Sequence, residues 1–176
     1  MAPTAVTPVV LGLLALGPRS GYDIKAAVDR STRFFWAASY GQIYPELRRL
    51  EADGLVAGED APNGARGRRV YELTDSGRKA LEEWLLGTSV TIEYRDESLL
   101  RLFFADALPR EQALALLEAR QRGHEQYLDV LRAIDALPGR DPDFVDLVLR
   151  WGIDFNDWGR QWCEHQLQRL RRKKRS

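Results

Sequence analysis

The sequence predicts a mainly α-helical protein with one small β-hairpin, divided into an N-terminal region (1–87) and a helical C-terminal region (88–176). Two observations indicate this fold class. Apolar residues recur at helical spacing along most of the chain, whereas only 55–59 and 69–73 have the character of short strands. With 176 residues, 44% of them hydrophobic, the chain is long enough for one mid-sized domain or two small ones, each with a buried core.

The first two expected helices differ in how apolar they are. Residues 8–16 are almost wholly apolar and begin with Pro8, which suits a first helical turn because its missing N–H would have no helical partner. Gly17 and Pro18 end this helix. Ser20 can then cap a second helix over 21–30, whose apolar face we expect to contain Tyr22, Ile24, Ala27 and Val28.

A third amphipathic helix is expected between Ser39, which can serve as its N-cap, and Gly54. Its apolar stripe consists of Ile43, Leu47 and Leu50, spaced so that they share one face. Pro45 lies inside this helix and removes one backbone hydrogen bond, to the carbonyl of Gly41. Because Gly41 has no side chain, we expect the helix to continue through the proline.

The hairpin and a fourth helix complete the N-terminal region. The strands 55–59 and 69–73 are joined by a segment that contains the turn residues Asn63-Gly64 and Gly67. Thr74 can cap the fourth helix, and Gly87 ends it. The buried stripe of this helix is expected to be Leu81, Trp84 and Leu85.

The order helix, helix, helix, hairpin, helix in under 90 residues is typical of a winged helix-turn-helix. Two strands alone cannot form a stable sheet, so the hairpin must lie on the helical core. In this fold the third helix enters the major groove of duplex DNA. The sequence therefore predicts a DNA-binding N-terminal region with the hairpin as its wing.

The outward face of the third helix has residues suited to DNA. Opposite its apolar stripe lie Gly41, Gln42, Pro45, Arg48 and Arg49. Gln42 can pair with an adenine edge, and Arg48 or Arg49 with guanine or phosphate. Tyr40 and Tyr44 flank this face and offer hydroxyls to phosphates.

Three arginines, Arg66, Arg68 and Arg69, lie near the tip of the expected wing, where they can reach a phosphate strand or a minor groove. Strand alternation should turn at least one of them back toward the sheet. An arginine-rich helix face is often only solvated, and the alternative is a winged-helix module that binds proteins and not DNA.

The C-terminal region is expected to contain helices over 94–105, over 109–137 and from 143 toward the tail. The last helix has a heptad-spaced apolar seam formed by Phe144, Val148, Trp151, Phe155, Trp158 and Trp162. Such a seam requires a facing surface. The preceding helix can supply part of it in an antiparallel pair, and Gly152 and Gly159 leave room for close approach of the backbones.

So many aromatic side chains exceed what one partner helix covers, so we expect a second subunit to complete the cover and form a homodimer. A second interpretation stays open. Trp151, Trp158 and Trp162, with Trp84, could line a site for a small, flat aromatic effector, although an aromatic stripe at helical spacing is usually core or dimer interface.

Three segments, GYDIKAAVD, GQIYPELRRLEADGLV and GRRVYELTDSGRKAL, resemble the PadR family of transcriptional regulators over residues 8–87. The segment EYRDESLLRLFF resembles, less specifically, the start of the helical C-terminal domain of the Vir-type subgroup. The resemblance implies a homodimer that binds an operator in double-stranded DNA and represses transcription; the effector is not implied. It also implies DNA contacts by Lys25, Tyr40, Gln42, Tyr44, Arg48, Arg66 and Arg68.

Composition argues against several other classes of protein. The single cysteine, Cys163, excludes an internal disulfide and a cysteine-based zinc site, and we expect no metal and no cofactor. Two histidines and the absence of nucleotide-binding or hydrolase motifs argue against an enzyme. Lys and Arg together number 26, as do Asp and Glu together, so the net charge does not indicate a DNA-binding protein.

The location of the protein is expected from its first apolar stretch. Residues 6–16 are fewer than the ~20 needed to cross a bilayer, and no basic segment precedes them. We therefore expect a cytoplasmic protein without a membrane partner.

Overall fold

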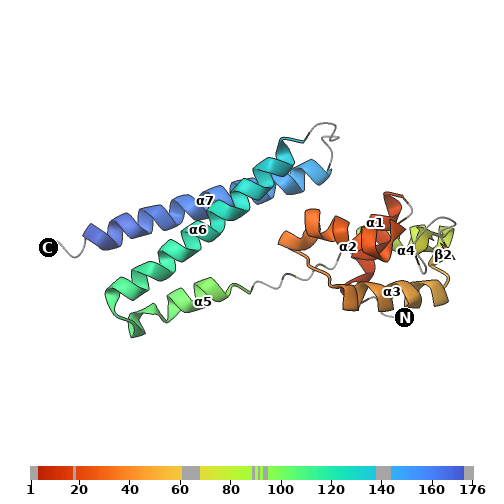
Figure 1. Ribbon diagram of the computed structural model, residues 1–176, viewed down its shortest axis with the longest axis horizontal. Helices are drawn as coiled ribbons and strands as arrows, with labels where there is room; N and C mark the ends of the chain where they lie inside the picture. Colours follow the sequence, from red (N-terminus) through yellow and green to blue (C-terminus); the bar gives the residue numbers. More distant parts are fainter. Residues whose placement is uncertain are drawn as a thin grey trace. The chain divides into compact units, whose positions relative to one another are not determined.

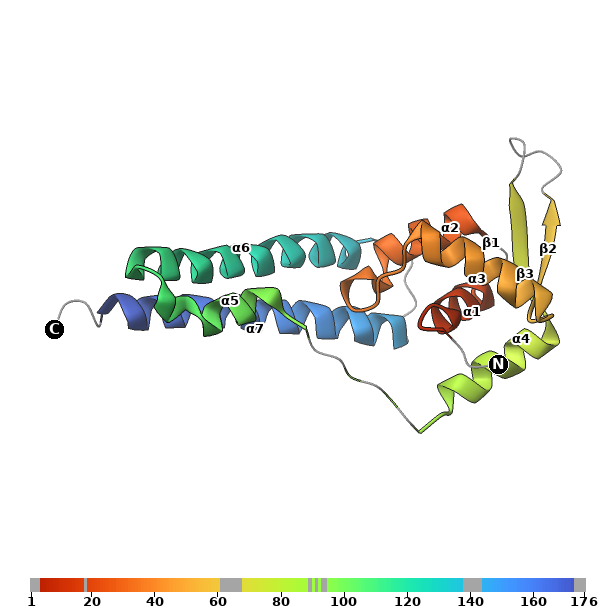
Figure 2. The same cartoon turned by 90° about the horizontal axis from the view of Figure 1, so that it is seen from below.

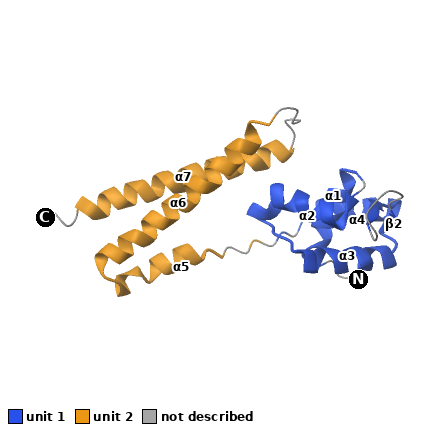
Figure 3. Cartoon of the chain, in the orientation of Figure 1, with its two compact units in different colours: residues 1–91 blue, residues 92–176 orange. Residues whose placement is uncertain are grey.

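The computed structural model describes residues 4–17, 19–60, 68–88, 90, 92, 95–137 and 144–172. It divides the chain into two compact units, Met1–Thr91 and Ile92–Ser176 (Figures 1 and 3). Both units are mainly helical, and the hairpin belongs to the first, which confirms the predicted fold class.

The described part of unit 1 contains α1 (Thr7–Ala15), α2 (Gly21–Arg30), a short 3-10 helix η1 (Thr32–Phe34), α3 (Tyr40–Ala52) and α4 (Asp75–Leu85). The expected caps are present. Ser20 and Asp23 form a capping box at the start of α2, and the Thr74 hydroxyl accepts a hydrogen bond from the Gly77 amide at 3.1 Å. As expected, α3 continues through Pro45.

A small antiparallel sheet lies beside these helices. The strands β2 (Val56–Asp60) and β3 (Arg69–Leu73) form the expected hairpin, paired from Val56↔Leu73 to Asp60↔Arg69 (Figure 2). The sequence did not predict β1 (Arg19–Ser20), which pairs with the other side of β3. A two-residue strand is too short to show the alternation that marks a strand in sequence.

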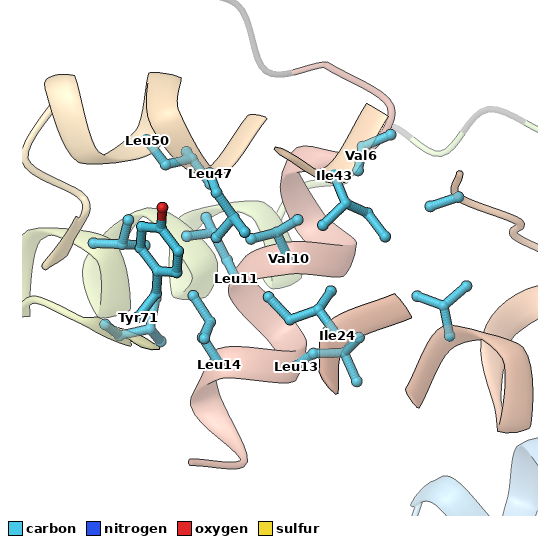
Figure 4. Close-up of a cluster of buried hydrophobic side chains, with 14 residues drawn as sticks. Val6, Val10, Leu11, Leu13, Leu14, Ile24, Ile43, Leu47, Leu50 and Tyr71 are labelled. Carbon is cyan, nitrogen blue, oxygen red and sulfur yellow. The ribbon is translucent and has the colours of Figure 1, made fainter. Parts of the chain in front are cut away.

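One hydrophobic core holds unit 1 together, and Figure 4 shows its side chains. Ile43, Leu47 and Leu50 of α3 are fully buried, as the helical spacing predicts. They pack with residues of α1, α2 and β3, among them Val10, Leu11, Ile24 and Tyr71. This core fixes one face of α3 and leaves the opposite face exposed.

Two expected core faces extend less far than predicted. On α4, Leu81 packs against the core, but Trp84 is 51% exposed and Leu85 is 65% exposed. The helix contacts the core through its first turns, where Gly77 lies against the carbonyl of Leu55, and its last turn runs past the core. Tyr22 on α2 is also largely exposed.

The described part of unit 2 contains α5 (Glu97–Phe103), a 3-10 helix η2 (Ala105–Ala107), α6 (Arg110–Asp135) and α7 (Phe144–Arg172). The helices α6 and α7 lie side by side and antiparallel (Figures 1 and 2). The α5 carboxylate of Asp96, at its N-cap, is bound by Arg120 of α6 at 2.7 Å. This ion pair fastens α5 to α6.

The side of α7 that packs on α6 differs from the aromatic seam by one residue. The packed line consists of Gly152, Asn156, Gly159, Cys163 and Leu167. The two glycines allow the expected close approach, since Leu131 lies against Gly152 and His124 against Gly159. The aromatic seam therefore lies at the edge of the α6–α7 contact, and part of it faces away from α6.

Candidate nucleic-acid interface

The outward face of α3 is the centre of the candidate site. Tyr40, Gly41, Gln42, Tyr44, Pro45 and Arg48 are all exposed, opposite the buried stripe of the helix. A helix face of this kind, with a buried opposite side, is the arrangement that a reading helix in a major groove requires.

The side chain of Gln42 has a structural role at the start of α3. Its carbonyl oxygen accepts hydrogen bonds from the backbone N–H and the hydroxyl of Ser39, both at 3.0 Å. Bidentate recognition of adenine uses both the oxygen and the NH₂ group of a glutamine. Gln42 can therefore donate to a base edge from its capping position, and must leave the cap to contact adenine with both groups.

Tyr40 and Tyr44 form a stacked pair at the α2 side of this face, with ring centroids 6.1 Å apart. The Lys25 ammonium of α2 lies 5.5 Å from the centroid of Tyr40 and also pairs with Asp29. Tyr44 lies directly against Gly21, where a Cβ atom would be 2.6 Å from its ring. These contacts place Lys25 and both tyrosines on one continuous surface.

The two neighbouring arginines of α3 lie in different surroundings. Arg48 is exposed and forms no ion pair with any residue that the structure describes. Arg49 donates to Glu46 at 3.0 Å, to Asp53 at 3.2 Å and to the Thr7 hydroxyl at 3.0 Å. Arg48 is thus available to a phosphate or base, whereas the guanidinium of Arg49 is occupied by its own chain.

Glu46, the partner of Arg49, is only 5% exposed and also accepts a hydrogen bond from the Thr7 hydroxyl. Burial alone would raise the pKa of this carboxyl, but the hydrogen bonds from Arg49 and Thr7 outweigh it and lower the pKa. The buried carboxylate is therefore charged and joins α3 to the first turn of α1.

The wing arginines also bind carboxylates of unit 1. Arg68, just before β3, pairs with Asp23 of α2 at 2.9 Å. Arg69 pairs with Glu51 of α3 at 2.5 Å and with Asp60 of β2 at 3.0 Å. Arg69 is thus the tip arginine that turns back toward the sheet, and the predicted Arg66 lies outside the described residues.

The contacts above bring most of the expected DNA-binding residues together. From Arg48 and the tyrosines the surface continues through Gly21 and Asp23 to Arg68. Three carboxylates that set where the arginines point were not predicted from the sequence: Asp23, Glu46 and Glu51. The spacing of Glu46, Arg49 and Asp53 at three and four residues on one helix was the signal that could have revealed one of these networks.

A second surface belongs to unit 2. The predicted seam on α7 is largely exposed: Trp151 and Trp158 are each 61% exposed, and Phe144 and Val148 are exposed too. Trp162 is 36% exposed, and Phe155 is half-buried between a stacked Trp151 and an edge-on His124. The chain itself therefore leaves much of this aromatic surface uncovered.

Other kinds of site find little support in the described part of the chain. It contains no group of three or more His, Cys, Asp or Glu side chains that could hold a metal ion. None of its helices is both long and apolar enough to cross a membrane. Burial raises the pKa of the Cys163 thiol, which argues against a reactive thiolate.

Known families match both halves of the chain. Residues 10–83 match the transcriptional regulator PadR-like family, and residues 94–171 match the virulence activator alpha C-term family. The chain is 34% identical over 125 residues to the negative transcriptional regulator PadR of Bacillus subtilis, covering 70% of this chain and 69% of that protein.

Solved structures agree with these matches. Bacillus subtilis PadR in complex with operator DNA has a TM-score of 0.82 at 28% identity, covering 95% of this chain and 99% of that one. The same PadR in complex with p-coumaric acid has a TM-score of 0.75, again at 28% identity, over 96% and 98% of the two chains. The PadR-like regulator BC1756 from Bacillus cereus has a TM-score of 0.84 at 26% identity, over 95% and 98%. This chain belongs to the PadR-like family of transcriptional regulators.

Proposed function

We propose that this protein is a homodimeric repressor that binds an operator in double-stranded DNA through α3 and the β2–β3 wing. The observation that carries the proposal is the exposed face of α3, where Arg48 is unpaired among the described residues and lies on the same helix as the tyrosine pair. The related PadR in complex with operator DNA supports the binding of an operator by this chain.

The proposed DNA contacts are those of the continuous surface described above, with the addition of Arg66 from the segment between β2 and β3 in the sequence. Arg48 contacts a base edge or phosphate, and Lys25 and the tyrosine hydroxyls contact phosphates. Arg68 can contribute if DNA phosphate replaces Asp23 as its partner. We do not assign Arg49 to the interface, because its guanidinium is bound by Glu46 and Asp53.

The proposed division of labour assigns DNA binding to residues 1–87 and dimerisation to 88–176. The exposed aromatic side chains of α7 are the proposed dimer contacts: Phe144, Val148, Trp151, Phe155, Trp158 and Trp162. Large exposed aromatic patches on a soluble chain mark interfaces. As a DNA-binding regulator, the protein is proposed to act in the cytoplasm.

We further propose that a small aromatic compound releases the repressor from DNA. The p-coumaric acid complex of the related PadR supports this class of effector. The tryptophans of α7 provide stacking surfaces for such a ring. Quenching of tryptophan fluorescence by p-coumaric acid, together with loss of the DNA complex, is the expected result; no change in either signal would contradict it.

The proposed function is tested by fluorescence anisotropy with a labelled duplex from the region upstream of the protein's own gene. The wild type should bind, with an affinity that falls steeply as salt rises. Arg48→Ala should weaken binding about tenfold or more and lower the salt slope by about one. Arg78→Ala, an exposed arginine on α4, is the matched control and should bind like the wild type.

A folded dimer that binds no duplex DNA at low salt would contradict the proposal. That result would favour the alternative, a winged-helix module that binds other proteins.

A further inference from the structure

We propose that Glu51, Arg69 and Gly58 are positioning residues that set the angle of the wing against the recognition helix α3. This inference rests on the proposed DNA-binding function. It assigns to Arg69 a role inside the protein, in place of a contact with phosphate.

The ion pairs of Arg69 join three elements at the loop end of the β2–β3 ladder. Glu51 lies near the end of α3, Arg69 is the first residue of β3, and Asp60 is the last residue of β2. The two guanidinium NH₂ groups of Arg69 bind different carboxylates, Glu51 at 2.5 Å and Asp60 at 3.0 Å. One planar group therefore ties both wing strands to α3.

The aromatic ring of Tyr71 supports this arrangement from β3. Its centroid lies 6.0 Å from the guanidinium carbon of Arg69. Tyr71 is itself part of the core that buries one face of α3. Arg69 is therefore held by a core residue as well as by the two carboxylates.

Gly58 in the middle of β2 leaves the space that the ion pair occupies. A Cβ atom at this position would lie 2.6 Å from Nε of Arg69, 2.7 Å from Oε1 of Glu51 and 2.9 Å from a ring carbon of Tyr71. Glycine inside a strand usually costs stability, and it often marks a close approach of another group. Here the approaching group is the Arg69–Glu51 pair.

Partial exposure limits what this pair adds to stability. Side-chain exposure is 39% for Arg69 and 30% for Glu51, so water screens the attraction. The role we infer for the pair is therefore geometric: the wing and α3 must contact DNA at the same time. If the wing lay at another angle to α3, its side chains would miss the phosphates next to the groove that α3 occupies.

The positioning role makes a prediction of opposite sign from simple electrostatics. Removing the negative charge of Glu51 near a DNA-binding face should strengthen binding to any duplex. Loss of the wing angle should instead weaken binding to the operator. Glu51→Gln therefore separates the two effects.

The experiment compares wild type and Glu51→Gln on the upstream duplex and on a scrambled duplex of the same composition, by fluorescence anisotropy. Circular dichroism sets a temperature at which each variant is folded. Glu51→Gln should bind the upstream duplex about tenfold more weakly, and the scrambled duplex at least as tightly as the wild type. Equal or tighter binding of the upstream duplex would overturn the proposal.

A second variant tests the space at Gly58 without any change in charge. Gly58→Ala should also weaken binding to the upstream duplex about tenfold, because the methyl group displaces Arg69 from Glu51. Gly12→Ala on α1 is the matched control, since a Cβ there meets nothing within 4 Å, and it should bind normally. Normal binding by Gly58→Ala would overturn the positioning role.

Different results would contradict the proposed function and the positioning role. If the wild type binds neither duplex, the proposed function is wrong. If the wild type prefers the upstream duplex and either variant binds that duplex as tightly as the wild type does, only the positioning role is wrong.

Discussion

Gly159 on α7 lies so close to His124 on α6 that a Cβ atom at residue 159 would be 2.6 Å from the imidazole ring. The same imidazole is hydrogen-bonded to Asn156 at 2.9 Å, and the amide of Asn156 donates to the carbonyl of Gly152. The glycine and the histidine together fix the distance and register of α6 and α7.

Gly159→Ala should therefore destabilise unit 2 by about 1–3 kcal/mol, because the methyl group forces the imidazole out of its site. Thermal unfolding followed by circular dichroism measures this effect. The control is Gly123→Ala on α6, where a Cβ meets nothing within 4 Å and alanine favours the helix. Equal melting temperatures for Gly159→Ala and the wild type would contradict the packing described.

Glu46→Gln tests the buried ion pair between α1 and α3. The pKa of Glu46 is lowered in the folded state from about 4.5, so its charge stabilises the fold above that pH and loses its effect as pH falls through the folded pKa. At pH 7 the free energy of unfolding of the variant should be about 1–3 kcal/mol lower than that of the wild type, and at pH 3 this difference should be smaller. Urea unfolding at the two pH values measures both.

The matched control for Glu46→Gln is Glu83→Gln on α4, where the carboxylate is exposed. It should change stability little at either pH. A Glu46→Gln variant whose deficit grows as pH falls would show that the sign of the linkage is wrong.

Arg49→Ala should behave as a stability variant, in contrast to Arg48→Ala. Removing Arg49 leaves the buried Glu46 carboxylate without its cation, which should cost about 1–3 kcal/mol in urea unfolding. At a temperature at which it is folded, the variant should retain DNA affinity within about threefold of the wild type. An Arg49→Ala protein of normal stability and much weaker DNA binding would reverse the assignment of the two arginines.

Trp158→Ala should weaken the proposed dimer. A tryptophan in the centre of an interface contributes about 2 kcal/mol or more, so the dimer dissociation constant should rise about thirtyfold. Sedimentation equilibrium measures it, with Arg122→Ala on the exposed side of α6 as the control. Unchanged dimerisation of Trp158→Ala would exclude this face as the dimer contact.

Local signals explain why most elements of the fold could be predicted from the sequence. Ser20, Ser39 and Thr74 each precede an apolar repeat, and each helix begins where its cap predicts. The hairpin follows from alternation and turn residues. The strand β1 was not predicted because two residues show no period and because its partners in β3, Val70 and Tyr71, are far away in the sequence.

Contacts between distant parts of the chain determined two features that the sequence pattern could not predict. Arg48 and Arg49 look equivalent in sequence. However, Glu46 and Thr7, which is far away in the chain, bind only the guanidinium of Arg49. Likewise, two adjacent lines of α7 have helical spacing, and the one with glycines packs on α6 because it allows closer approach. The spacing of residues in the sequence does not predict which arginine is bound or which line of α7 packs on α6.

The central claim, that α3 and the wing read a specific duplex, is tested most directly by a competition experiment at physiological salt. The wild-type protein is bound to the labelled upstream duplex and challenged with that duplex or with a scrambled one of the same composition. We predict that the scrambled duplex competes at least about a thousandfold less well. Equal competition by the two duplexes would contradict the account.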